Sequence, residues 1–476
     1  MSTLDWVIPV GESETGSYAM LKRLICAAFV GLLGSLSVAT AQLEVVVDRA
    51  DLKPTPLAIP NFEAIGVDAE TSQLISDVIR SDLESTGLFT ISPEEAYIQT
   101  DLNIEVAPRF ADWKIIQSDA LVVGTVEQIT RDGNDLIRGS VRMWDVYGEE
   151  LMRFEDSAGR QVSGRRFTTT PEDARRIAHK IADAIYTRLT GEDGYFDTRI
   201  VYIAETGPKN ARVKRLAIMD ADGANVKYLT SGAFTVLTPR FSPEAQQITY
   251  MSYEGGIPRV YLYDLRRARQ EVLGNFRSMT FAPRFSRDGN SVLLTQATNG
   301  NSDVYIMDLQ TRQSRRLTDH PAIDTSPSMS PDGRQIVFNS DRGGSPQLYI
   351  MNTDGSPRTC PSGGRDVACR ITFGTGRYST PVWSPRGDLI AFTKQTQGKF
   401  HIGVIGIDGR GERLLSQSYL DEGPDWSPNG RVITFFREAF PGASPTLWSV
   451  DLTGRNLRPL PTPTDASDPA WSPLLE

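Results

Sequence analysis

The sequence predicts a multidomain protein in which a small N-terminal α/β domain precedes an all-β, six-bladed β-propeller. Three observations lead to this fold class. A short phrase recurs through the second half of the chain at intervals in the forties, which is typical of propeller blades. The first half lacks this phrase and mixes helical with strand-like periodicity. The length of 476 residues exceeds that of one compact domain.

Composition excludes several functional classes. The net charge of −9, from 50 basic and 59 acidic residues, disfavours a nucleic-acid partner, because duplex binding needs a basic surface. Three cysteines and three histidines leave few ligands for a zinc site. P-loop, Gly-x-Ser-x-Gly, His-Glu-x-x-His and Cys-x-x-Cys motifs are absent from the sequence. We therefore expect no catalytic residue, no metal and no cofactor.

The N-terminus has the pattern of a secretory signal peptide. Lys22-Arg23 precedes the apolar run Leu24–Leu33, and the segment closes with Ala39-Thr40-Ala41. A transmembrane anchor is the alternative, but it would need about 20 apolar residues, and Gly and Ser interrupt this run. A lipoprotein is a weaker alternative, because Cys26 lies inside the run. We predict cleavage after Ala41.

Export changes how the neighbouring segments are interpreted. Residues 1–19 are polar and acidic and precede the signal peptide at 20–41, so we interpret them as a mis-assigned start. Cleavage leaves two cysteines, Cys360 and Cys369, in an exported protein. We predict a disulfide between them; two free buried thiols are the alternative.

Residues 42–196 are predicted to form the α/β domain. Apolar positions at helical spacing alternate there with strand-like runs, and Gly133 is a plausible hairpin turn between two of the strands. The expected elements are strands at 43–48, 57–62, 120–126 and 135–145, and helices at 69–86 and from Thr170 to about Leu189.

The recurring phrase, called the blade phrase here, is Pro-x-x-Ser with an aromatic residue usually before the serine. Its serines are spaced by 44, 44, 54, 43 and 45 residues, at Ser242, Ser286, Ser330, Ser384, Ser427 and Ser472. We expect the phrase to begin the first strand of each blade and Pro-Asp-Gly or a variant to make the following turn. Because none of these serines has a histidine at a matching place, we interpret them as scaffold.

The two ends of the repeat region, residues 197–476, are predicted to complete one blade together. Segments 199–204, 216–220 and 227–230 read as second, third and fourth strands, without a blade phrase before them. The phrase at 469–473 is a first strand without followers. Joining these strands closes a ring of six blades, which leaves no long exposed sheet edge.

Residues just before the blade phrase are expected to line one face around the central channel. We expect Phe281, Ile323 and Tyr378 in loops there, where exposed apolar side chains indicate a binding rim; local packing beneath the loops is the alternative. Asp421-Glu422 is expected in a loop that opens onto the ring, although a solvated surface is the default for acidic pairs. His179 is expected to be partly buried or on the surface of the second helix.

Together, the signal peptide, the α/β domain and the six blade phrases resemble the TolB family of the periplasmic Tol-Pal system. The most specific segment runs from Pro108 to Lys114 and continues through Asp119–Gly124, like the N-domain signature of that family. The resemblance covers 42–476. It implies a periplasmic adaptor without catalytic activity that binds the lipoprotein Pal through a propeller face and TolA through the mature N-terminus. That system maintains the outer membrane and its constriction during cell division.

The resemblance assigns residues to both partners. The Pal-binding residues it implies precede four blade phrases: Met279, Thr280, Phe281, Ala282, Ile323, Asp324, Thr325, Tyr378, Ser379, Thr380, Leu420, Asp421 and Glu422. The implied TolA-binding segment, from Gln42 to about Lys53, includes Gln42, Leu43, Glu44, Val45, Val46, Val47, Asp48 and Arg49. An unpaired strand of this kind could add to a partner's sheet.

Other envelope proteins are further candidate partners, and no membrane insertion is expected after cleavage. The alternative function is an exported peptidase or other hydrolase whose propeller filters substrate. Such an enzyme would need a separate hydrolase domain with a nucleophile elbow.

Overall fold

The computed structural model of the chain describes residues 43, 45, 53–274, 276 and 278–475. The predicted signal peptide, its cleavage at Ala41 and the prefix 1–19 lie outside the described residues. So do nine residues of the predicted TolA-binding segment: Gln42, Glu44, Val46, Val47, Asp48, Arg49, Ala50, Asp51 and Leu52. Among the described helices, none has the length and apolar character needed to span a bilayer.

The first part of the chain is an α/β region built on a mixed sheet, in the order β3-β1-β4-β5-β6. β2 also pairs with β4 and β9 with β5. The strands are β1 (Thr55–Ala58), β2 (Glu63–Ile65), β3 (Phe89–Ile91), β4 (Ala120–Arg131), β5 (Asn134–Asp145), β6 (Glu150–Met152) and β9 (Arg165–Thr169), with a separate pair β7 (Phe154–Glu155) and β8 (Gln161–Val162). The helices are α2 (Ala69–Ser85), α3 (Phe110–Ile115) and α4 (Ala174–Thr190), with short 3₁₀ turns η1 (Glu94–Ala96) and η2 (Pro171–Asp173).

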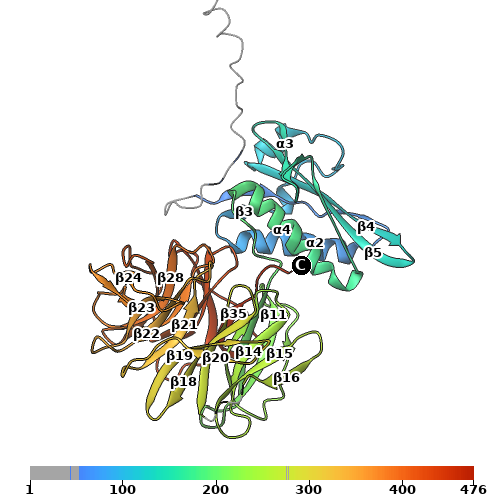
Figure 1. Cartoon of the computed structure of the whole chain (residues 1–476). Coiled ribbons are helices and arrows are strands. Elements are labelled where there is room, and N and C mark those ends of the chain that lie inside the picture. The colour runs from blue at the N-terminus through green and yellow to red at the C-terminus, as the bar shows by residue number, and fades with distance from the viewer. Residues whose placement is uncertain (1–42, 44, 46–52, 275, 277, 476) are drawn as a thin grey trace, which may run out of the picture. The chain divides into compact units, whose positions relative to one another are not determined.

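Helices α2 and α4 lie side by side (Figure 1) and share a core with one face of the sheet. The Asp68 carboxylate caps α2 by accepting from the Thr71 amide at 2.7 Å. α4 ends at Gly191, whose φ of 70° suits a left-handed C-cap. The predicted second helix differs at its start, because residues 171–173 form the 3₁₀ turn η2 before α4 begins. On the other face of the sheet, Trp113 of α3 packs against Leu121 and Trp144.

The second part is the predicted propeller of six four-stranded sheets. Their strands, from the innermost outward, are β13 (Val236–Phe241), β14 (Gln247–Ser252), β15 (Arg259–Asp264) and β16 (Arg269–Val272); β17 (Met279–Phe285), β18 (Ser291–Thr298), β19 (Asn301–Asp308) and β20 (Ser314–Arg316); β21 (Asp324–Met329), β22 (Gln335–Ser340), β23 (Gln347–Asn352) and β26 (Ala368–Arg370); β27 (Arg377–Trp383), β28 (Leu389–Thr396), β29 (Lys399–Gly406) and β30 (Arg413–Leu414); β31 (Leu420–Trp426), β32 (Val432–Glu438), β33 (Thr446–Asp451) and β34 (Arg458–Pro459).

The sixth sheet joins the two ends of the repeat region, as predicted. Its order is β35 (Asp465–Trp471), β10 (Arg199–Thr206), β11 (Val213–Asp220) and β12 (Lys227–Tyr228), with the 3₁₀ turn η3 (Lys209–Ala211) between β10 and β11. β35 pairs antiparallel with β10, from Ile200 opposite Trp471 to Glu205 opposite Asp465. The last strand of the chain therefore closes the ring through hydrogen bonds.

The blade phrase ends the first strand of each blade, which corrects the prediction that it begins that strand. The register with the second strand shifts just before the phrase, as at Phe281/Arg284 and Ser379/Val382, which marks a β-bulge. The residue before each proline has a positive φ, between 47° and 68°: Thr238, Ala282, Ser326, Thr380, Gly423 and Asp468. The strand therefore starts several residues earlier than the sequence suggested.

The serine of the phrase closes the turn to the second strand, in agreement with its predicted scaffold role. Ser286 Oγ accepts from the Ser291 amide at 2.9 Å and donates to Asp288 at 2.5 Å. Ser330 repeats both bonds in the next blade, with the Gln335 amide at 3.0 Å and Asp332 at 2.6 Å.

The long interval of the repeat contains a small extra hairpin, β24 (Arg358–Thr359) and β25 (Arg365–Asp366), inserted before the outermost strand β26. Cys360 and Cys369 form a disulfide that ties this hairpin to β26.

Candidate protein-binding face

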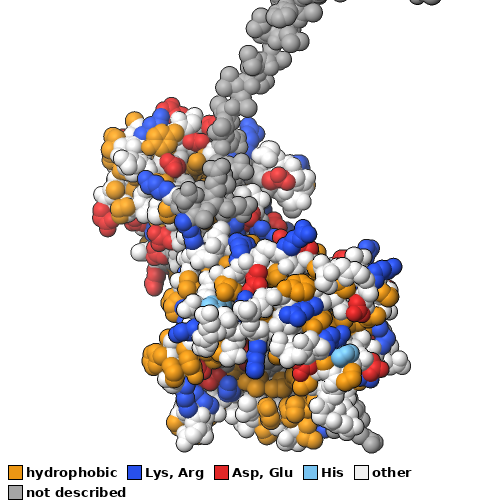
Figure 2. All heavy atoms as spheres, turned by 90° about the vertical axis from the view of Figure 1, so that its left-hand side faces the viewer, with side chains coloured by type: hydrophobic (Ala, Val, Ile, Leu, Met, Phe, Trp, Pro, Cys, Tyr) orange, Lys and Arg blue, Asp and Glu red, His pale blue; other side chains and the backbone are white. Residues whose placement is uncertain are grey.

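One end of the propeller, called the entry face here, consists of the loops that lead into the first strands and the hairpins between second and third strands. Antiparallel pairing within each blade brings these two kinds of loop to the same end. Exposed large apolar side chains concentrate there: Phe234, Tyr253, Ile257, Met279, Ile323, Phe373, Tyr419 and Phe440. Figure 2 shows hydrophobic side chains gathered toward the lower end of the propeller in that view, with charged side chains interspersed.

The predicted Pal-binding residues fall into three classes of exposure. Met279 and Ile323 are exposed, at 42% and 46%. Thr280, Asp324, Tyr378 and Asp421 are buried, each at 0%. The others are half-buried: Phe281, Ala282, Thr325, Ser379, Thr380, Leu420 and Glu422.

Three placements in loops are wrong. Phe281 lies in β17, Tyr378 in β27 and Asp421-Glu422 in β31, because the first strand extends back beyond the bulge. Alternate side chains of such a strand point into the space between blades. The entry face is therefore formed by fewer of the predicted residues than expected.

Two of the buried residues are carboxylates that fix the first strands. Asp421 is bound by Arg437 at 2.7 and 2.8 Å and by the Ser416 hydroxyl at 2.6 Å. Asp324 pairs with Arg342 through both carboxylate oxygens, at 3.0 and 2.8 Å. Bidentate Arg–carboxylate pairs hold both side chains in a defined geometry. These residues support the entry face from beneath it.

The other two buried residues are also satisfied internally. The Tyr378 hydroxyl donates to Glu412 at 2.9 Å, and Glu412 also binds Lys394 at 2.6 Å. Thr280 Oγ1 accepts from the Val260 amide at 3.2 Å. Neither side chain is free to bind a partner without rearrangement of the blade.

Glu422 and Asp468 lie close together near the channel. Burial, with a smaller contribution from Asp468, raises the pKa of Glu422 to about 6. Burial also raises the pKa of Asp468, which accepts from the Thr238 amide at 3.2 Å. Arg284 of β17 and Asp425 of β31 form an ion pair of 3.0 Å between their blades, beside a cavity of about 390 Å³ lined by the blade phrases.

The three histidines do not form a nucleophile-activating arrangement among the described residues. His320 Nδ1 accepts from the Ala322 amide at 3.0 Å, and His401 Nδ1 contacts the Ser416 carbonyl at 3.0 Å. The expectation that His179 is partly buried or at the surface is wrong: it is 3% exposed and contacts Asp82 at 2.7 Å. Among the described residues, none of the three rings is hydrogen-bonded to a serine or cysteine side chain.

Three residues of the predicted TolA-binding segment are described: Leu43, Val45 and Lys53, of which Lys53 is exposed. Val45 is 7% exposed and belongs to the core of the α/β region. Its amide donates to the Leu189 carbonyl of α4 at 2.7 Å. Leu43 packs, partly buried, against the same core.

Sequence reasoning missed most of the exposed apolar residues of the entry face. Phe234, Phe373 and Tyr419 lie in entry loops, whereas Ile257 and Phe440 lie in hairpins between second and third strands. A signal was present, because apolar residues next to glycine or proline, as in Gly256-Ile257-Pro258 and Phe440-Pro441-Gly442, are typical of exposed turns.

Comparison with known proteins identifies the family. Residues 186–475 match the family model described as the TolB beta propeller domain, and residues 43–152 match that of the TolB amino-terminal domain. The chain belongs to the TolB family. The Tol-Pal system protein TolB of Paramagnetospirillum magneticum is 52% identical over 465 residues, covering 96% of this chain and 98% of that relative. The crystal structure of TolB from Acinetobacter baumannii is 29% identical, with a TM-score of 0.75, and covers 91% of this chain and 100% of that one.

Proposed function

We propose that this member of the TolB family is a non-enzymatic periplasmic adaptor of the Tol-Pal system. It binds Pal through the entry face of the propeller and TolA through the segment from Gln42 to Lys53. In this way it supports outer-membrane integrity and constriction during cell division. Family membership supports the role in the system, because the relative that is 52% identical carries the name of that system.

The observation that carries the Pal assignment is the set of exposed apolar side chains on the entry face. Phe440 is 62% exposed, Phe373 is 53% exposed and Ile323 is 46% exposed. Aromatic residues and methionine are enriched in protein interfaces, and large exposed apolar patches on a soluble protein mark interaction sites. Beneath them, the Asp421–Arg437 and Asp324–Arg342 pairs give a fixed scaffold.

The placement of the N-terminal segment supports TolA as the second partner. Val45 belongs to the core of the α/β region, beside Leu189 of α4, whereas the entry face belongs to the propeller strands. The two partners would then bind different elements of one chain, as an adaptor requires. Addition of this segment to a partner's sheet would require Val45 to leave this core and its amide to exchange the Leu189 carbonyl for a partner's.

The competing function is an exported peptidase or hydrolase. It would require a nucleophile, a base and an orienting group in hydrogen-bond contact. The histidine contacts described above instead lead to carboxylates and backbone groups, which supports the adaptor over the enzyme.

Charge substitution on the entry face tests the Pal assignment. The double substitution Met279→Asp and Ile323→Asp places charges on two exposed side chains, so the fold is expected to persist. We expect affinity for purified Pal, measured by titration calorimetry, to fall at least tenfold, because desolvating a carboxylate costs more than an apolar contact gains.

The matched control is Leu414→Asp in β30, an outermost strand, where the apolar side chain is similarly exposed at 43%. It should bind Pal like the wild-type chain. Unchanged Pal affinity of the double variant, or equal loss in the control, would contradict the assignment of this face.

A further inference from the structure

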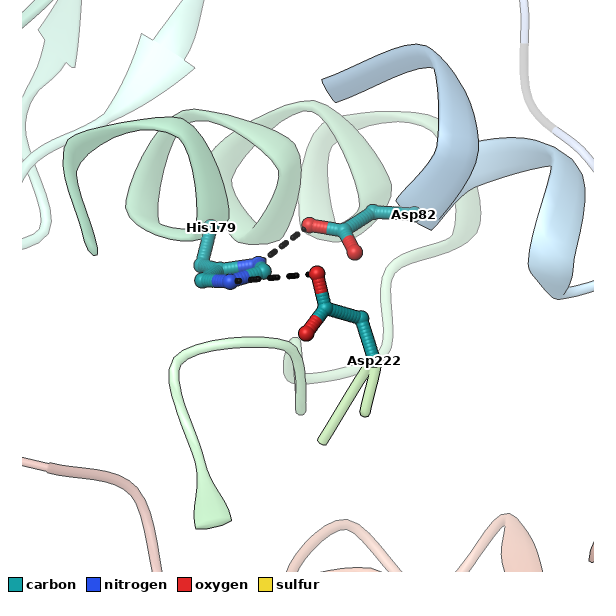
Figure 3. Close-up of side chains that lie close together, drawn as sticks. All are labelled: Asp82, His179 and Asp222. Atoms are coloured by element: carbon teal, nitrogen blue, oxygen red, sulfur yellow. Dashed lines mark hydrogen bonds and ion pairs between the residues drawn. The ribbon is translucent and has the colours of Figure 1, made fainter. Parts of the chain in front are cut away.

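His179 stands where the two helices of the α/β region meet one blade of the propeller. Figure 3 shows its ring on α4, facing the carboxylates of Asp82 on α2 and of Asp222 in the turn that follows β11. The ring is 3% exposed and Asp82 is 4% exposed. A buried histidine that faces two carboxylates from separate elements indicates an electrostatic role rather than ordinary core packing.

The two ring nitrogens face different carboxylates. Nδ1 contacts Asp82 Oδ2 at 2.7 Å. Nε2 is buried, makes no hydrogen bond and lies 3.8 Å from Asp222 Oδ2. A neutral imidazole carries a proton on one nitrogen, so it would present a lone pair to one of the carboxylates. A protonated ring presents an N–H to both.

The charges that face the ring also favour a proton on it. From α2 comes Asp82; from the end of β11 comes Asp220 and from the turn after it Asp222; from α4 come Arg175, which pairs with Asp222, and Asp183, which lies near Asp82. Asp220 accepts from Asn225 at 2.6 Å and lies 3.8 Å from Arg199. Asp222 and Asp220 therefore have partners other than the ring.

The remaining acidic groups are Asp183 and Asp82. Burial raises the pKa of Asp183 to about 7, so this carboxyl is about half protonated near neutral pH. Its oxygens accept from the Phe196 and Asp197 amides, at 2.8 and 3.1 Å. Burial raises the pKa of Asp82, and the charge of the ring and its hydrogen bond oppose that shift. The ring is therefore the partner that stabilises the ionised carboxylate, which would be costly to bury unpaired.

A shared metal ion fits this arrangement poorly. The three side chains are close enough together to be considered for one. However, Asp82 and Asp222 approach different nitrogens of the ring, and Arg175 already pairs with Asp222. A metal bound there would have to displace Arg175 from Asp222 and would lie beside that guanidinium.

We propose that His179 carries a proton at neutral pH and fastens α2 and α4 to the turn at Asp222, so that this attachment weakens when the ring loses its proton. Other contacts across the same junction include two neutral amides, from Asn456 to the Ser85 carbonyl at 2.6 Å and from Asn429 to the Asp193 carbonyl at 2.8 Å, and an ion pair of Arg386 with Glu192 at 3.0 Å. Neutral amides do not titrate. The His179 cluster therefore gives the junction a pH-dependent component.

The direction of the pH dependence follows from the charges. Burial alone would lower the pKa of His179, but the carboxylates of Asp82, Asp222 and Asp220 outweigh it and raise the pKa to about 9. A base whose pKa is raised by folding contributes stability that is fully present below its ordinary value of 6.5. That contribution is lost as the pH rises through about 9.

Nuclear magnetic resonance of the histidine-labelled full chain tests this proposal. The signals of the three histidines are assigned with His179→Gln, His320→Gln and His401→Gln. We expect the His179 ring to be protonated on both nitrogens at pH 7.5. Asp222→Asn should shift its titration to lower pH by at least about one unit. A neutral His179 ring at pH 7.5, or a titration unmoved by Asp222→Asn, would overturn the proposal.

Stability gives a second readout. His179→Gln should lower the thermal midpoint by several degrees at pH 6, on the order of 2–8 °C, and by much less at pH 10. His401→Gln is the matched control, because it removes an equally buried ring that contacts a backbone carbonyl. The fastening role would be contradicted if the difference in thermal midpoint stayed constant from pH 6 to pH 10. It would also be contradicted if a chelator removed one equivalent of metal from the chain and changed the His179 signal.

Discussion

Polar side chains in the first strands have two different roles, although they occupy neighbouring positions. Asp421 is buried in a bidentate pair with Arg437, whereas Glu422, one residue later, lies half-buried near Asp468 with a raised pKa. The sequence located both residues beside a blade phrase but not their burial. Burial depends on the face of the strand to which each side chain points. The bulge before the proline sets which residues point to which face.

The pKa of Glu422 leads to a prediction at this scale. Burial raises it from 4.5 to about 6, so the stability linked to its proton is present below pH 4.5 and is lost as the pH rises through about 6. The difference of about 1.5 units corresponds to about 2 kcal/mol. Glu422→Gln should therefore raise the free energy of unfolding by about 2 kcal/mol at pH 7.5 and leave it nearly unchanged at pH 4.5.

Urea denaturation at the two pH values measures this difference. Glu244→Gln, at an exposed position after the blade phrase, controls for the loss of one carboxylate at the surface. The prediction would be contradicted if the Glu422→Gln variant were less stable than the wild-type chain at pH 7.5. That result would show that the fold stabilises the ionised carboxylate.

At the scale of the element, periodicity predicted most of the strands and both long helices. Helix α2 and strand β5 lie close to their predicted bounds, whereas β4 runs five residues beyond its predicted end at 126. β4 and β5 pair along their whole length up to Arg131 opposite Asn134. The bulges were not predictable, because residues such as Thr238 and Ala282 adopt a positive φ that favours glycine and has no local sequence signal. Closure of each blade against its neighbour imposes that backbone.

The disulfide beside the hairpin β24–β25 is expected to stabilise that hairpin and not the rest of the blade. Cys360→Ser with Cys369→Ser should leave the propeller folded, because the hairpin is an insertion outside the four strands of its blade. The chain-entropy cost of opening so short a loop is at most about 3 kcal/mol. We expect faster hydrogen exchange confined to residues 356–368.

Peptide mapping by mass spectrometry without reductant should find Cys360 linked to Cys369. Free thiols in the exported chain, or exchange that rises throughout the blade after the double substitution, would contradict a locally acting disulfide.

At the scale of the molecule, the sequence predicted the number of blades and the closure by the terminal strand, because the blade phrase at 469–473 had no followers. Trp471 of β35 shows how closure is stabilised: its amide donates to Asp425 at 2.9 Å and its ring nitrogen to Thr198 at 2.8 Å. The His179 cluster was not predictable, since its three residues come from segments about 40 to 140 positions apart that only the packed fold brings together.

In the proposed function, one chain binds TolA and Pal at separate places. The most direct test is titration calorimetry of purified TolA and Pal with the mature chain lacking residues 42–53. Because Val45 packs on the α/β region and the entry face belongs to the propeller, this deletion should abolish TolA binding and leave Pal affinity within about twofold, well under 1.4 kcal/mol. Retained TolA binding, or equal loss of both partners from a folded chain, would contradict the account.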